Sequence, residues 1–196
     1  MFLDVDEYVT LLDSAYEPPG RSTRQVRLEM RLMACSMRVD TVSELRWKQF
    51  HRCETPEGDR WICKVKAKDS TDRESGTRPR SVFIPTDLME ELQKHVDGSV
   101  GDDDQLFKYT TCTIQRDVTR SAENAATKTG NDEFKKVSAH DLRRYFATHL
   151  LFRHEVPPPA VRVLGGWKSD EAMFEYLVLP NDVLFERLGA AGLLGT

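Results

Sequence analysis

The stretch that decides both the fold and the candidate site is residues 138–176. It begins S-A-H-D-L-R-R-Y-F-A-T-H-L and, after a proline-rich break, ends L-G-G-W-K-S-D-E-A-M-F-E-Y. Ser138 and Asp141 have the spacing of a capping box, so we predict that a helix begins there. His140 and Arg143 then share one face of its first turns, beside a helix N-terminus that favours an anion. This pair is therefore a candidate anion site.

The second half of the stretch places an aromatic pair after a glycine turn. Gly165–Gly166 is expected to end one helix. Ser169 or Asp170 is expected to cap the next, which carries Tyr176. Trp167 lies nine residues before Tyr176 and is either a packing residue or an N–H donor to an anion. A tyrosine near positive charge is a workable nucleophile, although most tyrosines are core residues.

The rest of the chain predicts a mainly α (α+β) fold, a single helical domain with a small three-stranded antiparallel sheet. Alternation of apolar and basic side chains predicts a strand over Trp61–Lys68. Its expected partners are Arg80–Pro85 and a strand at about residues 49–52. Asp4 or Asp6 is expected to cap a first helix with Val9, Leu11 and Leu12 in the core. Further helices are expected over Ser22–Cys35, Thr86–Val96 and Thr113–Ala126.

Composition narrows the class of protein. The chain has 196 residues, 39% of them hydrophobic, and no apolar run long enough to cross a membrane. The four cysteines show no C-x-x-C spacing, so no zinc site is expected. The net charge is −4, but residues 21–80 carry 15 basic and nine acidic side chains and residues 134–170 carry seven and three. Such blocks favour a polyanion as partner, or are simply solvated faces.

One upstream arginine completes the pattern. Arg38 stands seven residues before Leu45 and nine before Trp47. With the 138–176 stretch, this spacing resembles the catalytic domain of tyrosine recombinases, the phage integrase family. The motif residues look most similar to those of archaeal and phage integrases. The acidic residue usual in that family three positions after the arginine is replaced by Thr41. What orients Arg38 is therefore left open.

The resemblance implies a set of site residues. The expected catalytic residues are Arg38, Lys68, His140, Arg143, Trp167 and Tyr176, and the expected DNA contacts are Lys64, Lys66 and Arg144. Tyr176 would be the nucleophile, and a lysine of the hairpin would protonate the leaving 5′ oxygen. Lys68 is favoured for that role over the two neighbouring lysines on the same strand face. No cofactor and no metal is implied.

The resemblance also implies partners and a setting. The expected function is site-specific DNA recombination through a 3′-phosphotyrosyl intermediate, on double-stranded DNA, as a homo-tetramer that is monomeric or dimeric when free. The expected location is the cytoplasm of a prokaryotic host, at the nucleoid. Residues 1–196 would form the catalytic domain without the family's N-terminal core-binding domain, and residues 183–194 would be exchanged between subunits or packed on their own domain. A topoisomerase IB-like relaxase and a non-catalytic DNA-binding domain are the alternatives.

Overall fold

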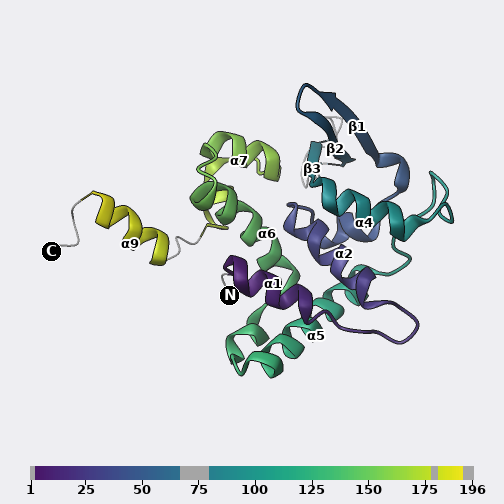
Figure 1. Ribbon diagram of the computed structural model, residues 1–196, viewed down its shortest axis with the longest axis horizontal. Coiled ribbons are helices and arrows are strands. Elements are labelled where there is room, and N and C mark those ends of the chain that lie inside the picture. The colour runs from purple at the N-terminus through teal and green to yellow at the C-terminus, as the bar shows by residue number, and fades with distance from the viewer. Residues whose placement is uncertain (1–2, 67–79, 178–180, 192–196) are drawn as a thin grey trace.

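The computed structural model describes residues 3–66, 80–177 and 181–191. Helices dominate it, with one small sheet (Figure 1). In chain order the elements are α1 (Val5–Asp13), α2 (Thr23–Ala34), α3 (Val39–Ser43), the 3-10 turn η1 (Trp47–Gln49), β1 (Phe50–Thr55), β2 (Gly58–Val65), β3 (Arg80–Ile84), α4 (Thr86–Val96), α5 (Thr111–Thr129), the 3-10 turn η2 (Asp132–Lys136), α6 (Ala139–Thr148), the π-helical segment η3 (His149–Arg153), α7 (Pro158–Gly165), α8 (Asp170–Phe174) and α9 (Asn181–Ala190). The predicted fold class is confirmed.

The sheet has the order β1-β2-β3 with both pairs antiparallel. Cys63 in the central strand pairs with Phe50 of β1 and Val82 of β3. All three are buried, because residues directly opposite each other on paired strands point to the same face of the sheet. Lys64 lies on the opposite, exposed face, as the alternation predicts. Residues 67–79, which include the end of the predicted strand, lie outside the described part of the chain.

The helix caps follow the sequence closely. Asp4 accepts a hydrogen bond from the Glu7 backbone N–H and begins α1, and Ser22 does the same for α2. The prediction that Val9 faces the core is wrong, because its side chain is 48% exposed. The neighbouring leucines of α1, Leu11 and Leu12, are buried as expected.

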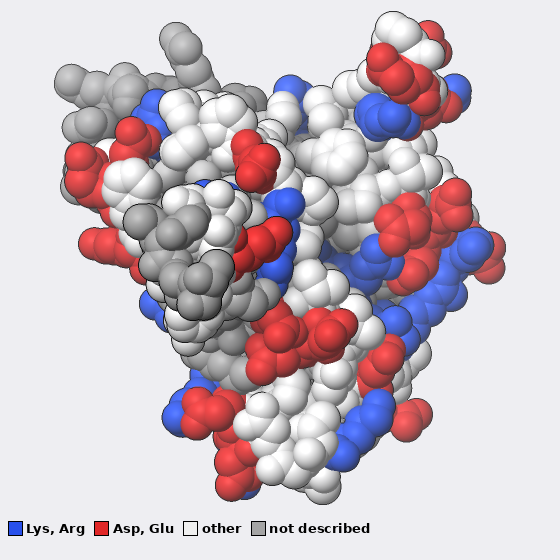
Figure 2. Space-filling model, turned by 60° about the vertical axis from the view of Figure 1, so that its left-hand side comes forward, with Lys and Arg blue, Asp and Glu red and all other residues white. Residues whose placement is uncertain are grey.

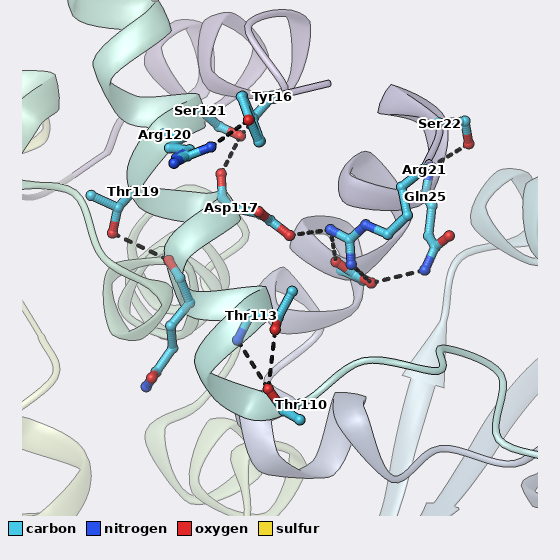
Figure 3. Close-up of polar contacts among 12 residues, drawn as sticks. Tyr16, Arg21, Ser22, Gln25, Thr110, Thr113, Asp117, Thr119, Arg120 and Ser121 are labelled. Carbon is cyan, nitrogen blue, oxygen red and sulfur yellow. Dashed lines mark hydrogen bonds and ion pairs between the residues drawn. The ribbon is translucent and has the colours of Figure 1, made fainter. Parts of the chain in front are cut away.

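A buried charged cluster joins three parts of the helical core (Figure 3). The guanidinium of Arg21 donates to Glu29 of α2 at 3.3 Å and to Asp117 of α5, and it lies 4.1 Å above the ring of Tyr109. All three charged side chains are at most 2% exposed. Arg21 therefore connects the loop before α2 to both α2 and α5 through ion pairs that are shielded from water.

Two cores meet at α6. The larger core lies among α1–α6 and the sheet and includes Leu142 and Tyr145 of α6. The smaller core contains Ala147 at the end of α6, together with Val161, Trp167 and Met173. The helix that carries His140 and Arg143 thus also supports the turn that carries Trp167.

The C-terminal helix α9 extends away from the remaining helices (Figure 1). Its contacts include an ion pair between Arg187 and Glu155 at 3.8 Å and the packing of Arg187 over the ring of Phe152. Whether this segment is exchanged between subunits stays a prediction. Among the described helices, none is both long and apolar enough to cross a bilayer.

Candidate functional site

The start of α6 is built as the capping pattern predicts. The Asp141 carboxylate accepts from the Ser138 backbone N–H at 2.9 Å and from its hydroxyl at 2.7 Å. This cap fixes the first turn, which exposes His140 and buries Arg143. The two side chains converge on Tyr176: the His140 ring lies 4.6 Å from the tyrosine ring, and the Arg143 guanidinium lies 5.7 Å from it.

Arg143 is held by backbone carbonyls. Its Nη2 donates to Gly165 O at 2.7 Å and its Nη1 donates to Ser36 O, while the guanidinium lies 4.6 Å from the Trp167 ring. Burial, followed by the positive charges of Arg80 and Arg38, lowers the pKa of Arg143 to about 10. It is therefore still charged at neutral pH. Its Nε finds no acceptor among the described residues.

Tyr176 lies just beyond a short helix rather than inside it. The predicted helix is shorter than expected, since α8 ends at Phe174. The Ser169 hydroxyl caps α8 by accepting from the Ala172 N–H at 3.2 Å. The backbone N–H of Tyr176 donates to Met173 O at 2.9 Å, and Met173 is fully buried. The tyrosine is thus anchored at its backbone while its ring faces the cluster.

Trp167 acts as a packing residue and also carries a donor without a partner. Gly166 has φ +67° and ends α7 in the left-handed region, as the Gly-Gly pattern predicts. The indole ring folds back over Gly165, where a Cβ would lie 1.5 Å from Trp167 Cζ3. The ring is 8% exposed and 5.2 Å from the Tyr176 ring. Trp167 Nε1 is buried with no acceptor among the described residues.

Arg38 lies at the N-cap position of α3 and is exposed. Its charge contributes to lowering the pKa of Arg143, of Arg80 and of His140, so it lies close to all three. Its carbonyl accepts from the Val42 N–H at 3.0 Å, whereas its guanidinium has no hydrogen bond or ion pair within the described ranges. At the position of the missing acidic residue, the Thr41 N–H donates to Asp40 at 2.8 Å instead.

Arg80 is a member of the cluster that the sequence did not single out. It is the first residue of β3, and the sequence pattern assigned it only to that strand. Its Nη1 donates to Leu164 O and to Ser36 Oγ, each at 2.9 Å, and its Nη2 donates to Ser36 O at 2.8 Å. Burial, and secondarily Arg38, lowers the pKa of Arg80 to about 10. The only local signal was a basic residue at the first position of a strand whose last three residues are apolar.

The predicted DNA contacts are more dispersed. Lys64 is exposed, with its Nζ 2.6 Å from Ser81 Oγ, and Lys66 is exposed just after β2. Arg144 is partly exposed beside His140 and forms an ion pair with Asp141 at 3.3 Å. Lys68 lies outside the described residues. Acidic and basic side chains are interleaved over the face in Figure 2.

The cluster is suited to an anion beside a phenol. Partial burial of the ring, then the charge of Arg144, lowers the pKa of His140 below 6.5, so its imidazole is mainly neutral at pH 7. Arg143, with the charges of Arg80 and Arg38 close to it, therefore lies beside the Tyr176 ring. Two buried N–H groups at this place, Arg143 Nε and Trp167 Nε1, have no acceptor among the described residues. Within the part of the chain that the structure describes, no group of three or more His, Cys, Asp or Glu could hold a metal ion.

The comparisons with known proteins agree with this geometry. The phage integrase family profile matches residues 1–180, and the chain belongs to this family. The fold is similar to XerA recombinase (TM-score 0.72, 22% identity, 97% of this chain and 65% of that one). It is also similar to XerH recombinase in a post-cleavage complex with a palindromic difH substrate (0.72, 21%, 98% and 52%). A third similar structure is the Tn1549 transposon integrase with transposon right end DNA (0.65, 13%, 97% and 65%).

The chain thus spans about half to two thirds of the solved proteins that it resembles. At these identities the likeness establishes the fold. No curated protein matched the sequence.

Proposed function

We propose that this chain cleaves and rejoins double-stranded DNA as the catalytic part of a site-specific recombinase. The observation that carries the proposal is a pair of buried donors beside Tyr176. Arg143 Nε and Trp167 Nε1 have no acceptor among the described residues, and a buried donor without an acceptor is costly. The non-bridging oxygens of a phosphodiester would supply the missing acceptors. Membership of the phage integrase family supports the same conclusion.

The proposed step is a transesterification. The Tyr176 oxygen forms a bond to the scissile phosphorus while the bond from phosphorus to the 5′ oxygen breaks. The tyrosine proton passes to the neutral imidazole of His140, and Lys68 protonates the leaving 5′ oxygen. The product is a 3′-phosphotyrosyl link and a free 5′-hydroxyl. Attack by a partner strand's 5′-hydroxyl reverses the step, so no external energy source enters the balance.

Arg38 and Arg143, the two arginines that match the family pattern, are proposed to stabilise negative charge on the phosphate. Negative charge grows on the non-bridging oxygens in the pentavalent transition state, and guanidinium groups match two such oxygens. Arg143 is already oriented by carbonyls, and Arg38 is exposed at the edge of the same cluster. We assign the phosphate oxygens to this pair with Trp167. Lys64, Lys66 and Arg144 are proposed to contact the DNA backbone.

The proposed recombinase function implies DNA and further copies of this chain as partners. Three solved structures of similar fold are complexes with DNA, namely those of XerH, the Tn1549 integrase and lambda integrase. Assembly as a homo-tetramer on DNA, in the nucleoid of a prokaryotic cell, is part of the proposal. Sedimentation with and without a cognate duplex would test the change in oligomeric state.

A nicked suicide duplex tests the chemistry. Cleavage beside the nick releases a short fragment, so the covalent protein–DNA adduct cannot reverse and survives denaturing electrophoresis. Tyr176→Phe should abolish the adduct, and Tyr16→Phe is the matched control. An adduct that persists in Tyr176→Phe would refute the assignment. No adduct despite tight binding would favour a DNA-binding module, and plasmid relaxation without exchange products would favour a topoisomerase.

A further inference from the structure

Arg80 joins two segments that are far apart in the sequence. Its guanidinium donates to Ser36 O and Ser36 Oγ, which lie between α2 and α3, and to Leu164 O near the end of α7. The Ser36 hydroxyl is itself 3.2 Å from Leu164 O. One side chain from the sheet thereby connects the loop between α2 and α3 to the last turn of α7, two segments that approach each other only in the folded chain.

Each of these segments leads directly into the candidate site. Ser36 precedes Arg38 by two residues, and Leu164 precedes Trp167 by three. Ser36 is also in a left-handed conformation, with φ +73°, which costs a non-glycine residue about 1 kcal/mol. Such a conformation persists only where the surroundings fix it. Here the fixing groups are Arg80 and Arg143, which both donate to the Ser36 carbonyl.

The position of Arg80 suits support rather than contact with a substrate. Its aliphatic stem lies under Gly166, where an added Cβ would be 2.5 Å from Arg80 Cδ. Both terminal nitrogens are already engaged with protein acceptors. Arg38, by contrast, is exposed and has no such bonds among the described residues. The two arginines therefore have different surroundings within one cluster.

We propose that Arg80 is a positioning residue, which fixes the turn bearing Arg38 against the turn bearing Trp167 without touching the phosphate. This inference rests on the function proposed above. It depends on the planar fork of the guanidinium, because three acceptors in two directions must be satisfied at once. A lysine would keep the charge but could not reproduce that geometry.

The first test compares Arg80→Lys and Arg80→Ala with the control Arg52→Ala, an exposed arginine of β1. Adduct formation on the suicide duplex is measured in single turnover at saturating protein, and the DNA Kd is measured separately. Both Arg80 variants should slow cleavage by about 100-fold, the order expected for a displacement of about 1 Å, with Kd nearly unchanged. A cleavage rate in Arg80→Lys equal to that of the unsubstituted chain would overturn the inference, as would a loss confined to Kd.

A second substrate separates positioning from phosphate contact. Replacing the scissile phosphate with a methylphosphonate removes the charge of one non-bridging oxygen, so a residue that neutralises this oxygen becomes less important. The cleavage deficit of Arg38→Ala should shrink on this substrate, whereas that of Arg80→Ala should stay. Rescue of Arg80→Ala to the same extent would place Arg80 on the phosphate and refute a positioning role.

Amide hydrogen exchange separates this inference from the proposed function. The N–H groups of Gly166 and Trp167 donate to Val163 O and Arg162 O, and Arg80→Lys should accelerate their exchange. If the unsubstituted chain forms no adduct but this acceleration is seen, the structural tie stands and the proposed function falls. If exchange at these amides is unchanged, the inference itself falls, whatever the activity.

Discussion

The buried cluster around Arg21 should make the stability of this protein fall as the pH rises. Arg21 faces two carboxylates, Glu29 and Asp117, so one cation cannot neutralise both. Burial raises the pKa of Glu29 to about 7, against the smaller lowering effects of Arg21 and of a hydrogen bond from Gln25. The folded state therefore holds a proton on this cluster that the unfolded chain releases.

The size of the effect follows from linkage. An exposed glutamate in the unfolded chain ionises near pH ~4.3. Between that value and about 7, the folded state binds more protons than the unfolded state, so the free energy of unfolding decreases with pH. The slope approaches about 1.4 kcal/mol per pH unit, and the full window amounts to about 4 kcal/mol. Above pH ~7 the contribution levels off.

Urea unfolding at pH 5, 6, 7 and 8 measures how the free energy of unfolding depends on pH. Glu29→Gln is the test variant, and Glu123→Gln, at an exposed position, is the control. Histidines complicate the raw curve. His95, His140 and His149 have pKa values lowered first by burial, and each adds stability as pH rises. The difference between the unsubstituted chain and Glu29→Gln isolates the cluster. If the free energy of unfolding had the same pH slope in the unsubstituted chain, in Glu29→Gln and in the control Glu123→Gln, this result would refute the reasoning.

Three further predictions concern the candidate site. Gly166→Ala should lower the free energy of unfolding, measured in urea, by about 2–4 kcal/mol, because alanine is strained in the left-handed region and its Cβ would displace Arg80. Gly130→Ala is the control, since Gly130 has φ +74° but open space around it, and it should cost only about 1 kcal/mol. Trp167→Phe keeps an aromatic ring but removes the indole N–H donor, so suicide-substrate cleavage should slow about 10-fold or more. The thermal midpoint should fall only modestly, because the smaller ring leaves a small cavity. Equal cleavage rates would contradict the prediction. Because partial burial lowers the pKa of His140 from 6.5, cleavage should be flat above pH 7 and fall only at some pH below 6.5, and His140→Gln should remove that fall.

Local sequence signals were sufficient for most of the fold. Capping residues such as Ser22 and alternation around Cys63 predicted elements that the structure contains. The expected burial of Val9 failed for a tertiary reason. Val5 and Val9, one helical turn apart, are both exposed on α1, and the neighbouring helices cover the leucines instead. A helix with two apolar stripes does not reveal which one its neighbours will cover.

The site was predictable only where a motif spaced its residues along the chain. His140 and Arg143 share a helix start, and the Gly-Gly turn announces Trp167, so the sequence could group these residues. Arg80 could not be found this way, because its acceptors, Ser36 and Leu164, are 44 and 84 residues away in the sequence. The end of α8 before Tyr176 was missed as well, since a cap predicts where a helix begins but not its length.

The choice of acceptors explains how this cluster can remain ready for an anion. Within the described residues, Arg80 and Arg143 are oriented by the Ser36, Leu164 and Gly165 carbonyls and by the Ser36 hydroxyl. A carboxylate could orient the same guanidinium groups, but it would also cancel their charge. Neutral carbonyls fix the geometry and leave the positive field in place, at the cost of a lowered pKa at both arginines. Because that pKa stays near 10, the arginines remain charged at neutral pH, and a dianionic transition state would meet cations already held in position.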